Sequence, residues 1–246
     1  MDRMIYLAMS AAKQMLTAQA VSAHNLANAS TIGFKADYDT FRAMPVFGPG
    51  HPTRAFAMVE RSGINGQPGS FETTANNLDI AVNGDGFIAV QSPDGSEAYT
   101  RAGDLKISVS GQLKTGAGHA VLGNGGPIAL PQSESILIGT DGTISIRPIG
   151  QESTTLADVD RIKLVAPDFA DLVKGEDGLF RLRDGSQAPP DSSVTVTSGV
   201  LERSNVNVVS EMIAMIEHAR QYEMAIKAMR SAQENDAAGA RILRIA

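Results

Sequence analysis

The chain has 246 residues, of which 43% are hydrophobic and 20% charged, so it is long enough to bury a substantial core. It contains no cysteine, which excludes disulfides, thiolate nucleophiles and thiolate metal sites. The net charge is −6, and the excess of acid lies in the middle, because residues 1–47 hold four basic against three acidic residues and residues 204–246 hold five of each. An acidic middle between nearly neutral ends argues against a nucleic-acid partner.

The N-terminal segment predicts an amphipathic helix over residues 2–28. Asp2 and Lys13 interrupt its apolar character, so we expect neither a secretory signal peptide nor direct insertion into a membrane. Gly33 should break the helix. Only Gln19 interrupts an apolar stripe whose members lie three and four residues apart: Ile5, Met9, Ala12, Leu16, Ala23 and Leu26.

The region after this helix combines large aromatic residues with many turn formers. Phe34, Tyr38 and Phe41 are side chains that we expect to be buried. Residues 45–75 contain four of the eleven prolines and five glycines. This composition predicts a loop with one short strand near Phe56–Glu60, in the form of a hairpin arm.

From Leu78 the apolar pattern changes to a period of two, which predicts strands. Asp-Gly pairs at 85–86, 94–95, 141–142, 177–178 and 184–185 are typical of tight hairpin turns. Short strands separated by such turns indicate an antiparallel β domain. After the segment LDIAVNGDGFIAVQ, strands are expected at Ala98–Arg101, Leu105–Val109, His119–Leu122, Ile136–Ile138, Thr143–Ile146, Ile162–Val165, Leu179–Leu182 and Val194–Thr197.

The C-terminal segment predicts a second, longer helix between Ser204 and Arg244, with one glycine and no proline. Ser210 is a suitable residue for its start. Its stripe needs a partner, and the N-terminal helix is the only comparable segment. Many alanines and methionines indicate close, adaptable packing, either within one chain or against neighbouring subunits. The stripe consists of Val209, Met212, Ile216, Ala219, Tyr222, Ile226 and Met229.

These elements predict an α+β fold, in which long terminal α-helices pack together in the manner of a coiled coil and a mainly antiparallel β domain forms the middle of the chain. The expected organisation is an N-terminal helical segment over 1–44, a loop or β-hairpin linker over 45–77, a β domain over 78–200 and a C-terminal helix over 201–246.

No pattern of catalytic or metal-binding residues stands out. The glycine-rich run at 123–126 precedes Pro127 and a strand-like run, so it predicts a turn and not a phosphate-binding loop. Asp85, Asp94 and Asp141 could pair as glycosidase carboxylates, but each begins an Asp-Gly turn. We therefore expect no catalytic residue, cofactor, metal or small-molecule substrate. The histidines stand far apart, at His24, His51, His119 and His218.

Two end motifs and the middle carry a resemblance to a known family. SAHNLANASTIGFK at 22–35 resembles the N-terminal signature of bacterial flagellar basal-body rod and hook proteins, and GVLERSNVNVVSEMIAMIEHARQYEMAIKAM at 199–229 resembles their C-terminal signature. NNLDIAVNGDGFIAVQ and AYTRAGDLKISVSGQLKT resemble the central β repeats of the family. The opening residues and the runs FRAMPVFGPGHPTRAF and GPIALPQSESILIGTDGTISI favour the proximal-rod members over the distal-rod members.

The resemblance implies a structural subunit of the flagellar drive shaft, which transmits motor torque to the hook and filament. Its partners would be copies of itself, other rod subunits and the flagellar type III export apparatus. It would be exported unfolded without a cleaved signal and assemble in the periplasmic space. A distal-rod subunit and, remotely, a secreted carbohydrate hydrolase built on the β middle are the alternatives.

The stripes and the end motifs together select the residues expected at the assembly interface. The side-chain amides among them could bridge subunits or cap helix ends within one chain. The set comprises Ile5, Met9, Leu16, Asn25, Leu26, Asn28, Gly33, Phe34, Asn205, Asn207, Met212, Ile216, Tyr222, Ile226 and Met229.

Overall fold

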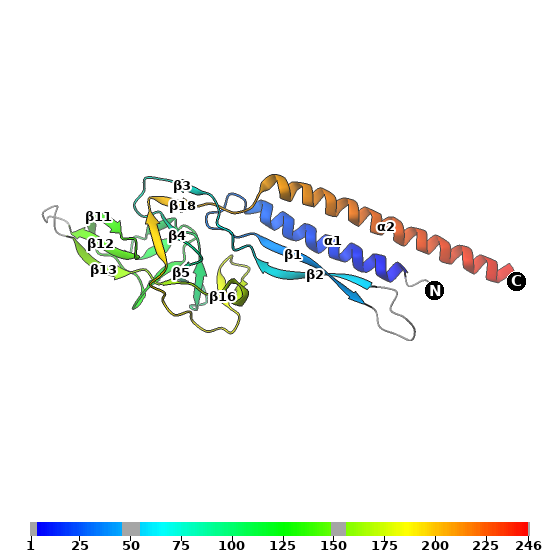
Figure 1. Ribbon diagram of the computed structural model, residues 1–246, viewed down its shortest axis with the longest axis horizontal. Helices are drawn as coiled ribbons and strands as arrows, with labels where there is room; N and C mark the ends of the chain where they lie inside the picture. The colour runs from blue at the N-terminus through cyan, green and yellow to red at the C-terminus, as the bar shows by residue number, and fades with distance from the viewer. Residues whose placement is uncertain (1–3, 46–54, 149–155, 246) are drawn as a thin grey trace. The chain divides into compact units, whose positions relative to one another are not determined.

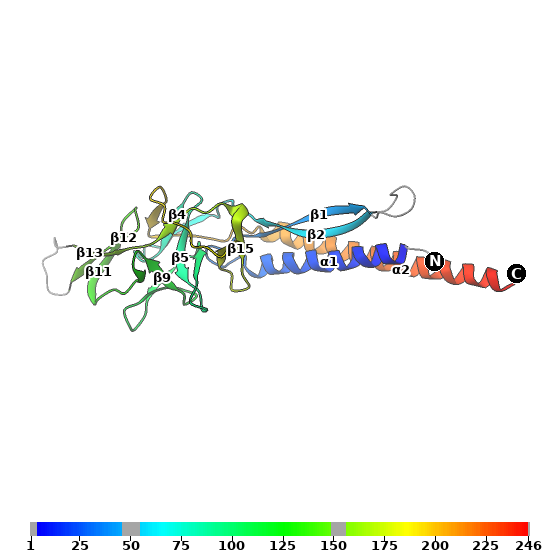
Figure 2. The same ribbon diagram turned by 90° about the horizontal axis from the view of Figure 1, so that it is seen from below.

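The computed structural model describes residues 4–45, 55–148 and 156–245, and it divides the chain into two compact units (Figures 1 and 2). The helical unit takes its residues from 1–27, 37–62 and 207–246. The β unit takes its residues from 28–36 and 63–206. Both ends of the chain therefore belong to one unit, as predicted. Neither helix in the described part of the chain has an apolar stretch that would suffice to cross a membrane.

The helical unit is built on two antiparallel helices, α1 (Met4–Ala27) and α2 (Val208–Ile245), which lie side by side in both views (Figures 1 and 2). At 1.5 Å per residue, the 38 residues of α2 span about 57 Å. Strands β1 (Asp37–Pro45) and β2 (Ala55–Ile64) form a two-stranded sheet, and β1 contacts α1. The predicted pair of terminal helices is confirmed, and the expected short strand near Phe56–Glu60 is part of the longer β2.

The buried face of α1 differs from the predicted stripe. Of that stripe only Ala12 is buried, whereas Met9 and Leu16 are 54% and 49% exposed. The prediction followed the spacing of apolar residues, but small side chains let two helices approach most closely, so most of the packed face consists of them. The buried residues of α1 are Ala8, Ala12, Met15, Ala18, Ser22 and Asn25.

On α2 the predicted stripe is half right. Ala219, Tyr222, Ile226 and Met229 are half-buried, as expected for an inner face. The N-terminal members of the stripe are exposed, and among the described side chains of α2 only Ala232 is fully buried. The helix surface around Ile216 therefore remains uncovered in the single chain.

The β unit is a set of antiparallel pairs, which confirms the predicted class. Its largest sheet has the order β15-β16-β6-β5-β9-β8-β7, with β10 on β9 and β14 on β5. A three-stranded sheet has the order β11-β12-β13, and two further pairs are β17-β4 and β18-β3. The strands are β3 (Phe71–Thr73), β4 (Ile80–Asn83), β5 (Phe87–Gln91), β6 (Glu97–Thr100), β7 (Leu105–Ile107), β8 (Leu113–Thr115), β9 (Ala120–Gly123), β10 (Gly126–Pro127), β11 (Ser133–Ile138), β12 (Thr143–Pro148), β13 (Ala157–Arg161), β14 (Leu164–Val165), β15 (Leu172–Lys174), β16 (Phe180–Leu182), β17 (Thr195–Ser198) and β18 (Val200–Glu202).

One five-residue turn recurs between consecutive strands, at 92–96, 108–112, 115–119, 139–143 and 175–179. In each, the first N–H donates to the fifth carbonyl, and the fourth residue, a glycine with positive φ, donates its N–H to the first carbonyl. Only glycine adopts this backbone conformation at little cost. Three of the predicted Asp-Gly hairpins are thus confirmed.

The other two Asp-Gly pairs do not close hairpins. Asp184-Gly185 forms a turn after β16, and Asp85-Gly86 links β4 to β5, which lie in different sheets. In that link the positive φ belongs to Gly84. An Asp-Gly pair thus indicates a turn, but it forms a hairpin only where the strands on either side of it pair with each other.

The core of the β unit lies on both faces of β5. Ile88 and Val90 belong to one buried cluster, and Phe87 and Ala89 to the other. Successive residues of a strand point to opposite faces, so a strand covered on both sides is apolar throughout. The rings of Phe87 and Phe180 meet edge to face, with centroids 5.4 Å apart.

The three aromatic residues after α1 have different fates. Phe34 is buried, and Lys174 Nζ lies 3.6 Å from the centroid of its ring. Tyr38 is 49% exposed, so the expectation of burial was wrong there, because β1 belongs to a sheet of only two strands. The side chain of Phe41 lies outside the described residues.

Candidate assembly surface

The outside of the helical unit carries large apolar side chains. On α2, Val209, Met212, Ile213 and Ile216 are 65%, 52%, 53% and 55% exposed, and we call these four the outer stripe. Their spacing of three, one and three residues places them on one side of the helix. Single chains rarely expose contiguous apolar surface unless it serves an interaction.

The inner side of the same helix differs in its burial. Ala214, Met215 and His218 are half-buried and interleave with the outer stripe in sequence. The helix thus has two apolar sides, of which α1 covers one. On α1, further large exposed side chains are Met4, Tyr6, Met9 and Leu16.

Asn25 ties three elements of the helical unit together. Its side chain, 2% exposed, donates from Nδ2 to the carbonyl of Asp37 at 3.0 Å and to Glu211 Oε1 at 3.2 Å. Its Oδ1 accepts from the Asp37 N–H at 3.0 Å. The end of α1, the start of β1 and the first turn of α2 are therefore fixed by one amide.

Asn207 is the N-cap of α2. Its Oδ1 accepts from the N–H groups of Val209 and Ser210 at 3.0 and 3.1 Å, and its carbonyl accepts from Glu211. The predicted start at Ser210 was therefore too late. Asn28 plays a similar local part after α1, where it accepts from the Thr31 hydroxyl.

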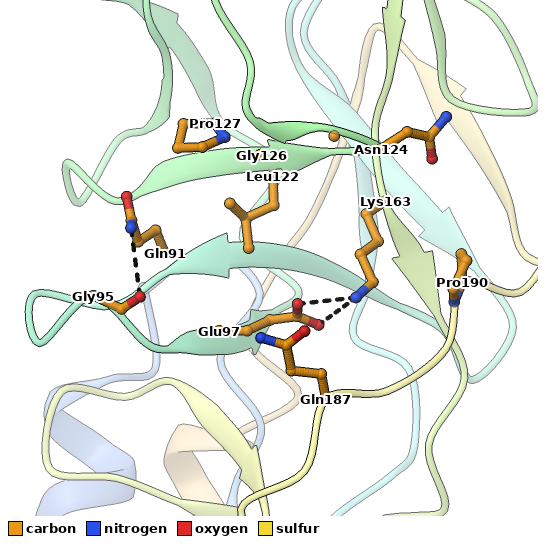
Figure 3. Close-up of a pocket in the computed structure, with 11 residues that line it drawn as sticks. Gln91, Gly95, Glu97, Leu122, Asn124, Gly126, Pro127, Lys163, Gln187 and Pro190 are labelled. Carbon is orange, nitrogen blue, oxygen red and sulfur yellow. Dashed lines mark hydrogen bonds and ion pairs between the residues drawn. The ribbon is translucent and has the colours of Figure 1, made fainter.

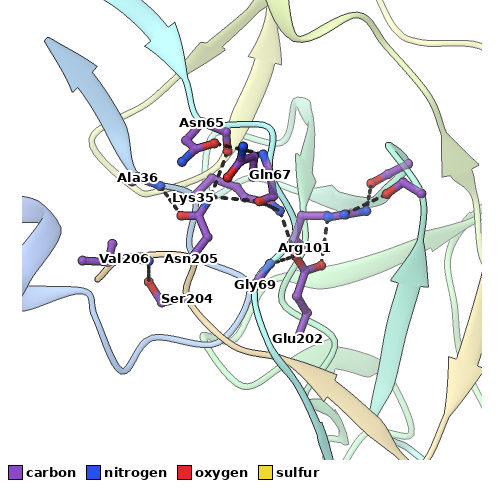
Figure 4. A network of polar contacts seen from close by, with 12 residues as sticks. Lys35, Ala36, Asn65, Gln67, Gly69, Arg101, Glu202, Ser204, Asn205 and Val206 are labelled. Carbon is purple, nitrogen blue, oxygen red and sulfur yellow. Dashed lines mark hydrogen bonds and ion pairs between the residues drawn. The ribbon is translucent and has the colours of Figure 1, made fainter. Parts of the chain in front are cut away.

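In the β unit, the side chain of Asn205 binds backbone groups of three other residues. Its Oδ1 accepts from the Ala36 N–H at 2.8 Å, and its Nδ2 donates to the carbonyls of Asn65 and Gln67 at 3.0 and 2.9 Å (Figure 4). Its backbone N–H reaches the carbonyl of Phe34 at 3.3 Å. The two end motifs thus meet here through backbone groups that would otherwise lack partners.

A buried ion cluster lies beside this contact (Figure 4). Lys35, Arg101 and Glu202 are each 1% exposed. Lys35 Nζ donates to Glu202 Oε1 at 2.8 Å and to the Gln67 carbonyl at 2.8 Å. Arg101 Nε lies 3.1 Å from Glu202 Oε2, close enough for charge attraction but out of line for a hydrogen bond. Burial lowers the pKa of Lys35, and the hydrogen bond to Glu202 opposes that shift.

Gly33 shows why the N-terminal motif needs a glycine. It has a positive φ of 67°, its N–H donates to the Glu202 carbonyl at 2.8 Å, and a Cβ there would lie 2.3 Å from the Arg101 carbonyl carbon. No side chain fits this place. Sequence reasoning missed the cluster, although Lys35 and Glu202 are themselves letters of the two end motifs.

The β unit has a shallow cavity of about 400 Å³, whose lining includes Glu97, Lys163, Gln91 and Gln187 (Figure 3). Glu97 is held by Lys163 Nζ, at 2.8 and 2.9 Å from its two oxygens. The hydroxyl of Tyr99 donates to Glu97 Oε1 at 3.1 Å, and burial raises the pKa of Tyr99 to about 12. The one acidic residue that lines this cavity is therefore neutralised by a lysine, and the lining offers no second carboxylate for an acid–base pair.

The carboxylates of the Asp-Gly turns serve those turns. Hydrogen bonds from Ser96 lower the pKa of Asp94, and hydrogen bonds from Thr143 lower that of Asp141. A carboxyl that ionises so readily is a poor general acid. The residues that the structure describes include no group of three His, Asp or Glu side chains placed to hold a metal ion.

The structure places the predicted interface residues in three groups. Met9, Leu16, Met212, Ile216 and Asn207 are exposed, and Ile5, Leu26, Asn28, Asn205, Tyr222, Ile226 and Met229 are half-buried. The buried ones, Asn25, Gly33 and Phe34, make contacts within the chain.

Three family models match successive parts of the chain. The model for flagella basal body rod proteins matches residues 5–35, that for the D1 domain of the flagellar hook proteins FlgE/F/G matches 81–146, and that for the C-terminal part of the rod proteins FlgEFG matches 197–242.

Relatives match over nearly the full length. The chain is 46% identical over 241 residues to the flagellar basal-body rod protein FlgF of Escherichia coli K12 and 44% identical over 242 residues to FlgF of Salmonella typhimurium LT2, with 96% of each chain covered. It is 32% identical over 258 residues to the rod protein FlgG of Bacillus subtilis, with 95% of this chain and 96% of the relative covered. Identity at this level over the whole length, together with the paired terminal helices and the antiparallel middle, shows that the chain belongs to the family of flagellar basal-body rod proteins.

Proposed function

We propose that this chain is a structural subunit of the proximal part of the flagellar rod. The outer stripe is the observation that carries the proposal, because it leaves apolar surface of α2 uncovered in the single chain. A rod subunit needs such a surface, since its terminal helices must pack against those of its neighbours. The higher identity to the two FlgF proteins than to the FlgG protein supports the proximal over the distal position.

The partners are copies of the same chain and other rod subunits, reached through the terminal helices. The asparagines of the end motifs act indirectly, because Asn25 and Asn207 fix where α1 ends and α2 begins. Assembly takes place in the periplasmic space, after export without a cleaved signal by the flagellar export apparatus.

The role is mechanical and not enzymatic. The cavity of the β unit offers Glu97 already bound by Lys163, and the turn carboxylates are held by their own hydrogen bonds. Torque transmission requires extended contacts between subunits, and the 38 residues of α2 offer the length for them.

The test is Ile216→Asp in the full chain. Ile216 is 55% exposed, so the folded subunit should tolerate the change within about 0.5 kcal/mol. In a rod, the same carboxylate would be buried in an apolar contact, where an unpaired charge costs several kcal/mol. We expect normal thermal unfolding and normal export, but no incorporation into basal bodies and no motility.

Glu217→Lys is the matched control, because Glu217 is also exposed, lies one residue away at the margin of the outer stripe, and is charged already, so the change adds no charge to an apolar position. It should preserve motility. Normal assembly of the Ile216→Asp protein would show that the outer stripe is not an interface. Unfolding of the free subunit would show that this surface belongs to the internal packing of the chain.

A further inference from the structure

The last part of the β unit completes structure that begins far earlier in the chain. Residues 194–206, which we call the clasp, contain β17 and β18. β17 pairs with β4, so that Thr195 lies opposite Asn83, 112 residues earlier in the sequence. β18 pairs with β3, with Glu202 opposite Phe71. Strands β3 and β4 therefore gain these backbone hydrogen bonds only once the clasp is present.

The clasp also completes the apolar core. Val194 and Val196 are 5% and 1% exposed, and they belong to the same cluster as Ile80 and Val82. Without Val194 and Val196, the side chains of Ile80 and Val82, which are buried in the folded unit, would be exposed to solvent. The closing of this cluster thus depends on residues that are synthesised late.

The charges inside the β unit depend on the clasp most strongly. Lys35 and Arg101 both pair with Glu202, and all three are 1% exposed. The other carboxylate whose charge acts on both cations is Asp85. Burying Lys35 and Arg101 without their paired anion is costly, because both cations lose their solvation. We therefore expect this site to remain solvated until Glu202 is in place.

Backbone contacts extend this dependence to the first residues of the unit. The N–H of Gly33 donates to the Glu202 carbonyl, and Arg203 donates to the carbonyl of Ser70 at 2.8 Å. Gly69 donates its N–H to Glu202 Oε1 at 3.0 Å. Segments around residues 33 and 70 are therefore fixed by the clasp and not by each other alone.

We propose that the clasp controls when the β unit folds. The unit stays unfolded until residues 194–206 are available for pairing, so a chain that emerges N-terminus first does not fold this unit before its clasp has emerged. Pairing of β17 with β4 and of β18 with β3 costs loop-closure entropy, because the strands are far apart in the sequence. In addition, Lys35 and Arg101 raise the free energy of any state that buries them without Glu202. The inference concerns the chain alone and does not rest on its place in the rod.

The test is the protease resistance of ribosome-bound chains of increasing length, made from the full coding sequence. Chains that expose residues up to 190 should be digested throughout the β unit. Resistance should appear in one step, when residue 206 has left the ribosome. A resistant β unit in chains that do not yet expose residue 194 would overturn the proposal.

Glu202→Gln tests the charge contribution in chains that expose the whole clasp. Loss of the anion should lower the folding equilibrium constant about a hundredfold or more, so these chains should be digested correspondingly faster than wild-type chains of the same length. Glu72→Gln is the control, because Glu72 lies on β3 and pairs with Arg203 at the surface, where their side chains are 53% and 60% exposed. It should become resistant at the wild-type length. If Glu202→Gln also does so, the buried charges do not gate folding.

Discussion

The two units of this chain bury their residues in opposite ways. In the β unit, strand β5 is covered on both faces, and the buried cations Lys35 and Arg101 both pair with Glu202. In the helical unit, the buried face of α1 consists mainly of small side chains, while larger side chains such as Met9 and Ile216 stay outside. The β unit thus buries its own apolar and charged groups, whereas the helical unit leaves large apolar side chains exposed.

This difference assigns different physical tasks to the two units. A closed core with paired charges gives a subunit its stability, which point changes inside that core reduce. An open apolar helix surface contributes little to the single chain but determines what the chain associates with. Substitutions in the two units should therefore separate stability from assembly.

The largest expected effect on stability is that of Glu202→Gln in the full chain. It leaves Lys35 and Arg101 in a dry site without their paired carboxylate, which typically costs about 3–5 kcal/mol. Urea unfolding followed by far-UV circular dichroism measures the change. If the midpoint is the same as in the Glu72→Gln control, the ion cluster does not hold the β unit together.

A pair of truncations compares the two cores directly. Ile144, 0% exposed, lies in the main apolar cluster, so Ile144→Ala should cost about 2–5 kcal/mol. Met15, 8% exposed, lies on the packed face of α1, and Met15→Ala should lower the unfolding free energy of the β unit by less than about 0.5 kcal/mol. Equal losses of β-unit stability in chemical denaturation would show that the packing of α1 also supports the β unit.

Acid should weaken the β unit through its turn carboxylates. The hydrogen bond from Arg181 lowers the pKa of Asp177 below the ordinary 3.8, and Thr143 does the same for Asp141. Because the folded pKa lies below the unfolded one, the stabilisation is present above about pH 4 and is lost as the pH falls further. Thermal unfolding between pH 7 and 2.5 tests this, and a stability that rises in this acid range would contradict the assignment.

Asp141→Asn is expected to have the smallest effect. The side chain is 55% exposed and caps its turn through Thr143, contacts that an amide oxygen can largely retain. The unfolding free energy should change by about 0.5 kcal/mol or less, and swimming in soft agar should be unaffected. Complete loss of motility with an intact fold would revive a catalytic role for this carboxylate.

Much of this fold could be predicted from the sequence, because the signals are local. The two helices follow from apolar spacing, and the hairpins at Asp94-Gly95 and Asp141-Gly142 follow from turn chemistry. Strands such as β13, with the sequence ADVDR, were missed because its residues are largely polar and its pairing with β12 comes from tertiary context.

The candidate site was predictable in outline but not in detail. Ile216 and Met9 were chosen as members of packed stripes, yet both are exposed, and on α1 the buried residues include the small Ala8 and Ala12 beside Met9. The ion cluster joins residues 35, 101 and 202, and a contact between residues so distant leaves no periodic signal in one sequence. The sequence offered one indication: Lys35 and Glu202 both lie within the two end motifs that resemble the family signatures.

The most direct test is hydrogen–deuterium exchange on the full chain, resolved by peptide, as free subunit and in isolated basal bodies. The β unit is expected to be protected in both states, with the slowest amides in β4, β5 and β17. Peptides from α1 and α2 should exchange fast in the free subunit and slowly in basal bodies, because neighbours cover the outer stripe. Helices already as protected in the free subunit as the β core would contradict the account.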